Sequence, residues 1–138
     1  AGDATGAAQA FTDLLTNQMQ VLGNDHPDTL TTRNNLAACR GEAGDATGAA
    51  QAFTDLLTNQ MQVLGNDHPD TLTTRSNLAS WQGRAGDAVG AAQAFTDLLT
   101  DQVRVLGNDH PDTLTTRNNL ASWRGEAGDA TGAAQAFA

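Results

Sequence analysis

Three histidines are the residues of this chain that most invite a chemical role. The motif Asn-Asp-His-Pro-Asp occurs three times and places His26, His68 and His110 beside carboxylates. Imidazole and carboxylate are ligands that zinc accepts, and a histidine paired with a carboxylate is also a common element of acid–base catalysis. The motif therefore raises two hypotheses, a metal site and an enzyme active site.

The spacing of the motif argues against both hypotheses. Successive histidines lie 42 residues apart, and stacked helical units would set them roughly 10 Å apart, the distance between packed helices. That separation exceeds a shared coordination sphere. One active site would not normally be copied three times, and the sequence has no Gly-rich phosphate loop, nucleophile elbow or zincin helix. We therefore expect the histidines to serve in turns and helix caps, in a non-catalytic protein without metal or cofactor.

An internal repeat is the main feature of the chain. Residues 1–42, 43–84 and 85–126 are close copies, and residues 127–138 begin a fourth. A linear array gives each internal copy the same neighbours and so tolerates near-identical sequence, whereas a compact globule would place the copies in different surroundings. The repeat therefore predicts a solenoid that forms a single domain over residues 1–138. Near-identity also indicates either recent duplication or consensus design, and the sequence leaves both open.

Residues that start and stop helices predict two helices within each copy. In the first copy, Asp3 is placed to cap a helix over residues 4–22 that Gly23 ends, and Pro27 begins a second helix that runs to about Glu42. The chain has only four Phe, two Trp and no Tyr, so Ala and Leu must supply most of the core. Such a core suits closely packed helices better than a sheet, which favours β-branched and aromatic residues.

Two groups of residues resemble the tetratricopeptide repeat family. Leu36-Ala37 followed by Gly44-Asp45, Ala49 and Phe53 resembles its signature, and the pattern recurs in each copy. His26-Pro27-Asp28-Thr29-Leu30 with Asn34-Asn35-Leu36-Ala37 is similar to the 42-residue repeats of kinesin light chains and of arrays attached to nucleotide-binding regulators. The resemblance implies an all-α, right-handed α-solenoid of antiparallel helix pairs. Helix A is then the helix after the His-Pro-Asp motif, and helix B is the helix after Gly-Asp.

The resemblance also implies a binding surface, because helix A lines a concave groove in this family. Asn35, Asn77 and Asn119 fall where a groove asparagine commonly holds a peptide backbone, and an amide both donates and accepts hydrogen bonds. The expected partner is a protein or peptide, and the alternative is that these small polar residues merely fit a solvated surface. The expected groove residues are Thr31, Asn34, Asn35, Thr73, Ser76, Asn77, Thr115, Asn118 and Asn119.

Helix A departs from the family pattern at two positions. The family usually carries a bulky residue where Arg33, Arg75 and Arg117 stand, and an aromatic residue where Arg40, Gln82 and Arg124 stand. We expect the packing between helices to differ there, with arginine stems over apolar surface and their charged ends at Asp carboxylates. A third position holds Cys39, Trp81 and Trp123, and the two tryptophans are expected in the core between repeats rather than as ligand platforms.

The ends of the array suggest a second function. Solenoids need polar terminal units, yet the chain opens on a helix B and closes on a partial copy. Residues 127–137 repeat residues 1–11 letter for letter, so the opening helix of a second molecule could take the place of that partial copy. The alternative to a partner-binding scaffold is thus a structural array that assembles into a homo-oligomer. Its expected contact residues are Phe11, Leu14, Leu15, Leu114, Leu120 and Trp123.

Charge and cysteine content limit the expected partners and location of the protein. The net charge is −9, from 16 acidic and 7 basic residues, so a polyanion such as nucleic acid would be repelled. The acidic surface either keeps the protein in solution or recruits a basic partner, and the sequence leaves both open. Cys39 is the single cysteine, and no stretch is apolar enough to predict a membrane span or signal peptide. We therefore expect no membrane partner and a cytoplasmic location.

Overall fold

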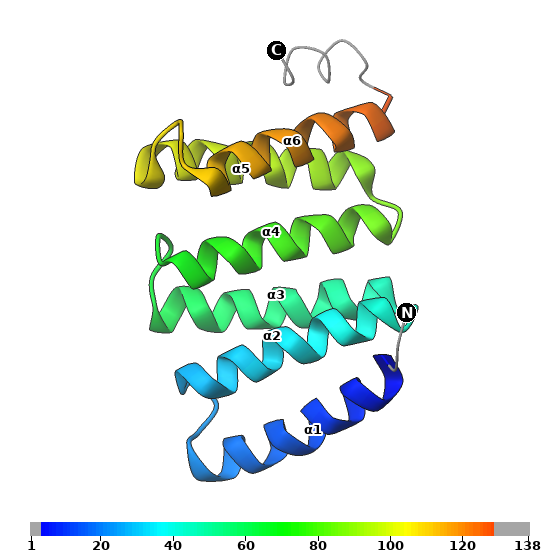
Figure 1. Ribbon diagram of the computed structural model, residues 1–138, viewed down its shortest axis with the longest axis vertical. Coiled ribbons are helices and arrows are strands. Elements are labelled where there is room, and N and C mark those ends of the chain that lie inside the picture. The colour runs from blue at the N-terminus through cyan, green and yellow to red at the C-terminus, as the bar shows by residue number, and fades with distance from the viewer. Residues whose placement is uncertain (1–3, 129–138) are drawn as a thin grey trace. The chain divides into compact units, whose positions relative to one another are not determined.

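Six α-helices make up the described part of the protein. The computed structural model describes residues 4–128, and it contains no strand within them. The all-α class and the two helices per copy are confirmed, and α2 has the predicted bounds. α1 ends one residue before the predicted Leu22, and Asp3 lies outside the described residues. The helices are α1 (Ala4–Val21), α2 (Pro27–Glu42), α3 (Ala46–Val63), α4 (Pro69–Arg84), α5 (Ala88–Leu106) and α6 (Pro111–Glu126) (Figure 1).

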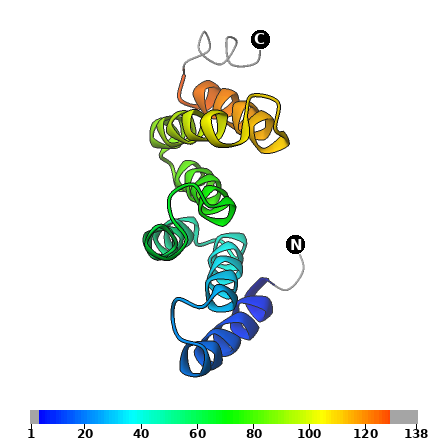
Figure 2. The same cartoon turned by 90° about the vertical axis from the view of Figure 1, so that its left-hand side faces the viewer.

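The chain divides into two compact units, Ala1–Thr74 and Arg75–Ala138, and α4 contributes to both. In the first unit, α2 packs against α1 on one side and against α3 on the other. In the second unit, α5 and α6 lie side by side, as the two views agree (Figures 1 and 2). α2, α4 and α6 are the A helices, and α1, α3 and α5 are the B helices. Each unit thus contains A and B helices in direct contact.

Short-range hydrogen bonds explain where the B helices begin. The Asp45 carboxylate accepts a hydrogen bond from the Gly48 N–H at 2.8 Å, and Asp87 accepts one from Gly90 at the same distance. These bonds satisfy a backbone donor that has no partner within the helix. A Cβ at Gly48 would collide with the Asp45 side chain, so glycine there lets the cap close. The preceding turn uses Gly44 at φ +104°, a conformation that glycine adopts without strain.

The core lies along one face of α3 and one face of α5. Ala49, Phe53 and Leu56 are 0% exposed in α3, and their spacing of four and three residues places them on one side of the helix. Ala91, Phe95 and Leu98 form the same row in α5 and are at most 1% exposed. The A helices add a smaller set of apolar side chains. Ala and Leu supply most of the buried apolar residues, as expected; those of the A helices are Leu30, Leu36, Ala37, Leu72, Ala79, Trp81, Leu120 and Ala121.

The arginines of helix A interact with polar side chains outside their own helix. Arg75 pairs with Asp101 at 2.5 Å between Nη1 and Oδ2, which confirms the expected arginine–aspartate contact. Arg117 instead donates to the Asn108 side-chain oxygen at 3.3 Å. Burial lowers the pKa of Arg33, although the carboxylates of Asp55 and Asp25 oppose that shift. The same type of residue therefore has a different partner in each copy.

The packing around Arg33 leaves a hollow where α1, α2 and α3 meet. A cavity of ≈ 300 Å³ lies there, with Leu15 and Leu36 on its apolar side and Arg33, Arg40 and Asp55 on its charged side. Because the arginine stems do not fill the volume that a bulky aromatic residue would fill, the surrounding side chains lose packing contacts. The expected difference in packing at these positions is thus present in the first unit.

The position that holds Cys39 in the first copy holds a tryptophan in the later copies. Trp81 is 8% exposed, as expected for a core residue, and the Arg84 guanidinium lies 4.5 Å from its ring centroid. Trp123 is half-buried, and its six-membered ring lies against Gly83 of α4. Cys39, at this position in the first copy, is also half-buried. A glycine and a large ring therefore pack together within the second unit.

Candidate functional site

The three histidines cap the A helices. The Asp28 N–H donates to Nδ1 of His26 at 3.1 Å, and Asp70 and Asp112 donate to His68 and His110 at 3.0 Å. Each imidazole thus satisfies a backbone donor of the first helical turn, which confirms the predicted capping role. Within residues 4–128, no cluster of three histidine, cysteine or acidic side chains is arranged to hold a metal ion.

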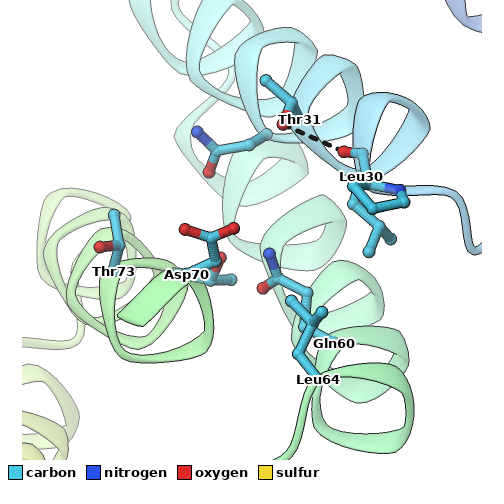
Figure 3. Close-up of a pocket in the computed structure, with 9 residues that line it drawn as sticks. Leu30, Thr31, Gln60, Leu64, Asp70 and Thr73 are labelled. Carbon is cyan, nitrogen blue, oxygen red and sulfur yellow. Dashed lines mark hydrogen bonds between the residues drawn. The ribbon is translucent and has the colours of Figure 1, made fainter. Parts of the chain in front are cut away.

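A pocket lies on the helix-A side of the first unit, between α2, the end of α3 and the start of α4 (Figure 3). Its volume is ≈ 180 Å³, and an engineered apolar cavity of about 150 Å³ is already large enough to bind benzene. The pocket therefore has room for one side chain of a partner. The residues that line it are Pro27, Leu30, Thr31, Asn34, Gln60, Leu64, Asp70, Thr73 and Thr74.

Helical spacing brings these residues together. Pro27, Thr31 and Asn34 follow one another at four and three residues on α2, so they share one side of that helix. Asp70 and Thr73 have a spacing of three in the first turn of α4. The Thr31 hydroxyl donates to the Pro27 carbonyl at 3.1 Å (Figure 3). Two helix beginnings thus form the polar walls of the pocket.

Gln60 brings an unpartnered acceptor to the pocket. Its side chain is 4% exposed, and its Oε1 is buried without a hydrogen-bond partner. Leaving such a group unpartnered costs about 1–3 kcal/mol. Gln18 and Gln102, one period before and one period after, have the same buried and unpartnered Oε1. The cost is thus repeated at the same position of α1, α3 and α5.

The charge and the apolar floor of the pocket complete the site. Of the described residues that line it, Asp70 is the one with an acidic side chain, and Figure 3 shows its carboxylate near the Gln60 amide. Leu30 is 2% exposed and forms apolar wall together with Leu64. The pocket therefore combines a negative charge, a buried acceptor and aliphatic surface.

The pocket contains three of the predicted groove residues, Thr31, Asn34 and Thr73. Asn35 is half-buried on α2 and is not part of its lining. Ser76 and Asn77 are half-buried on α4, in the part that belongs to the second unit. On α6, Thr115 and Asn118 are exposed and Asn119 is half-buried.

Gln60, Leu64 and Asp70 were not predicted from the sequence as site residues. Gln60 had a detectable signal, because it continues the apolar row of Phe53 and Leu56 as a polar residue. A polar side chain in an otherwise apolar row is unusual, and it recurs at Gln18 and Gln102. Asp70 lies in the histidine motif, but nothing in its spacing indicates that it meets helix B.

The predicted self-association residues differ widely in exposure. Leu14 is 43% exposed and Leu114 is 49% exposed, whereas Phe11, Leu15 and Trp123 are half-buried. Leu120 is only 3% exposed. It lies on the buried side of α6, next in sequence to the fully buried Ala121.

Comparison with known proteins places the repeat in a family. Residues 71–112 match the tetratricopeptide repeat. No curated relative matches the sequence. In the part of the chain that the structure describes, no helix has the length and apolarity needed to cross a membrane.

Several solved structures share the fold. A protein of Podosopora anserina assigned as a kinesin light chain, with nearly identical TPR-like repeats, is 21% identical with a TM-score of 0.88 over 98% of this chain and 64% of that one. A variant of it has 21% identity, a TM-score of 0.87 and the same coverage of 98% and 64%. BtubC (BKLC) from P. vanneervenii is 20% identical with a TM-score of 0.87 over 98% of this chain and 54% of that one. The chain thus spans less than two thirds of each of these structures.

The matched stretch is one period long, and the sequence repeats it closely at residues 29–70. The helix pairs and the likeness over 98% of the chain establish an all-α helical-repeat solenoid. Solenoids of this kind present extended surfaces on which other proteins bind. One period of the chain thus matches the tetratricopeptide repeat, and the chain shares the fold of solved structures with TPR-like repeats, among them one assigned as a kinesin light chain.

Proposed function

We propose that the chain is a non-catalytic scaffold for protein–protein interaction and that the helix-A side of its first unit binds an extended peptide. The observation that carries this proposal is the pocket in which Thr31, Asn34 and Thr73 come together over the apolar side chains of Leu30 and Leu64. Polar groups at a rim above an apolar floor suit a peptide, because its backbone forms hydrogen bonds while one side chain enters the pocket.

Recognition of this kind needs little rearrangement of the protein. The pocket walls are helices, and the Thr31 hydroxyl is already held against the Pro27 carbonyl, so few groups must be ordered on binding. Each hydrogen bond to the peptide contributes about 0.5–1.5 kcal/mol, and affinity accumulates over successive repeats. Within the first unit Asn35 is a further proposed contact, and in the second unit the proposed peptide contacts are Ser76, Asn77, Thr115, Asn118 and Asn119.

Peptides selected from a random phage-displayed library on the native chain test this proposal. We expect the double replacement Thr31→Val and Asn34→Ala to weaken their binding at least about tenfold, or 1.4 kcal/mol. Asn17→Ala removes an exposed asparagine of α1 and serves as the matched control with unchanged affinity. If selected peptides bind the double variant as tightly as the native chain, the pocket is not their site and the proposal is wrong.

A second candidate function is self-association, and one comparison favours it. Leu14 of α1 is 43% exposed, whereas the residues at the same position of α3 and α5, Leu56 and Leu98, are 0% and 1% exposed. Met19, Val21 and Leu22 are also exposed, at 44%, 72% and 40%. Burying a few hundred Å² of such surface at about 25 cal/mol per Å² gives several kcal/mol before the cost of association. We propose a second copy of this chain as its occupant.

Sedimentation of the 138-residue chain over a hundredfold range of concentration, with reductant present, tests this second candidate. We expect the mean mass to rise with concentration and Leu14→Asp to hold the protein at one chain. Asn17→Asp introduces the same charge at another exposed position of α1 and is expected to leave assembly intact. A native chain that remains monomeric throughout the range would eliminate self-association through this helix.

A further inference from the structure

We infer that the pocket of the first unit selects a cationic side chain, so that the partner is an extended peptide bearing lysine or arginine. This inference rests on the proposed peptide-binding function and adds the chemical class of the residue that enters the pocket. Three features of the described lining carry it, namely the charge at Asp70, the unpartnered acceptor of Gln60 and the aliphatic surface between them.

The Asp70 carboxylate offsets the positive helix ends at the pocket. The beginning of each helix contributes roughly +0.5 charge, and α2 and α4 both begin here. Asp70 lies in the lining, so its negative charge offsets these two partial charges, and Asp28 at the second position of α2, next to Pro27 of the lining, adds a further negative charge beyond it. The chain as a whole has a net charge of −9, which attracts a basic peptide over longer distances. An anionic side chain would meet repulsion both on approach and inside the pocket.

The Gln60 acceptor requires a donor. Its Oε1 is buried without a hydrogen-bond partner, and Figure 3 shows the Gln60 amide near the Asp70 carboxylate, with the amide nitrogen on the side of that carboxylate. A group that reaches both the Gln60 Oε1 and the Asp70 carboxylate must donate in more than one direction. Lysine offers three N–H donors and arginine offers five, while neither offers an acceptor. A cationic head therefore fits the two acceptors better than a hydroxyl, which has a single donor.

The apolar walls suit the stem of the same side chain. Leu30 and Leu64 line the pocket, and the methylene chains of lysine and arginine pack on apolar surface while their charged heads reach polar groups. A volume of ≈ 180 Å³ accommodates one such side chain. A purely apolar side chain would desolvate the Asp70 carboxylate without replacing its lost hydrogen bonds, which is unfavourable. The combination therefore favours a long cationic residue.

Three synthetic peptides and the full 138-residue chain test this inference. The probes are a capped peptide of alternating alanine and lysine, the same peptide with acetyl-lysine, and the same peptide with glutamate. Binding is followed through amide resonances of Thr31, Asn34 and Gln60 at about 0.15 M salt, where distant charges are screened. We expect the lysine peptide to bind at least about tenfold more tightly than the acetyl-lysine peptide, because acetylation removes the charge, and we expect no binding of the glutamate peptide.

Two matched pairs of variants assign the effect to the pocket. Asp70→Asn is expected to weaken lysine-peptide binding at least about fivefold, whereas Asp28→Asn, which changes the same helix position outside the pocket lining, is expected to change it less than about twofold. Gln60→Met keeps the side-chain shape and is expected to weaken binding while leaving the thermal stability unchanged or higher, because it removes an unpartnered acceptor. Gln102→Met is its control.

The outcomes separate this inference from the function on which it rests. Equal losses for Asp28→Asn and Asp70→Asn would mean that net charge alone attracts the peptide, and the inference would be wrong. If the acetyl-lysine peptide shifts the Thr31 and Asn34 resonances with the same affinity as the lysine peptide, the peptide-binding proposal is supported but the inference of cation selection is wrong. If none of the three peptides shifts those resonances, the proposed peptide-binding function fails as well.

Discussion

Leu56→Ala is expected to lower the free energy of unfolding by about 2–5 kcal/mol, whereas Leu14→Ala is expected to lower it by less than about 1 kcal/mol. The two leucines occupy the same position of successive B helices. Leu56 is 0% exposed and Leu14 is 43% exposed, so only the first replacement removes fully buried methyl groups and leaves a cavity. Identical sequence context makes burial the one large difference between the two sites.

Urea denaturation followed by circular dichroism measures both effects. Leu98→Ala is a further matched change, because Leu98 is 1% exposed in α5 and is expected to behave like Leu56. Equal losses of stability at Leu14 and Leu56 would contradict the exposure difference. They would indicate that another surface covers Leu14 in solution, and the sedimentation measurement then identifies a second copy as that cover.

Gly83→Ala is expected to destabilise the protein by about 1–3 kcal/mol. Alanine ordinarily stabilises a helix interior by about 1 kcal/mol relative to glycine, so the expected sign is the reverse of the intrinsic preference. The reason is that a Cβ at Gly83 would collide with the six-membered ring of Trp123. Thermal unfolding of the variant gives the sign of the effect directly.

Two further variants identify the ring as the cause. In a Trp123→Leu background, Gly83→Ala is expected to become neutral or stabilising, because the obstructing ring is gone. Gly125→Ala changes the same position of the third copy, where the glycine is exposed, and is expected to raise stability by up to about 1 kcal/mol. If Gly83→Ala proved stabilising in the native background, α4 and the Trp123 ring could not be in the contact described.

Local signals in the sequence were sufficient to predict the helices. Pro27 and Glu42 are the observed bounds of α2, because helix starts and stops depend on residues within a few positions of one another. Thr31 and Asn34 were expected in the groove from the family resemblance, and helical spacing places them on one side of α2. Predictions of this kind require only the geometry of a single helix.

Features that depend on contacts between helices could not be derived in this way. Gln60 and Asp70 lie on different helices, and their meeting depends on the register of α3 against the start of α4. The burial of Leu120 could not be derived from the sequence either, because it depends on where the neighbouring helix lies. The sequence did contain a partial signal for Gln60, a polar residue repeated within an apolar row. Asp70, on the other side of the pocket, had no such signal.

The contact between Arg75 and Asp101 distinguishes one end of the near-identical repeats from the other in stability. Asp101 stands where the earlier copies have Asn17 and Asn59, and Asn59 donates to Asp25 at 3.3 Å instead of pairing with an arginine. In a chain of nearest-neighbour interfaces, the weakest link opens first. The second unit has the Arg75–Asp101 ion pair where the first unit has the Asn59–Asp25 hydrogen bond, and α1 also has the less buried leucine. We therefore expect unfolding to begin at α1 and to proceed toward the C-terminal repeats, so that near-identical copies unfold in a fixed order.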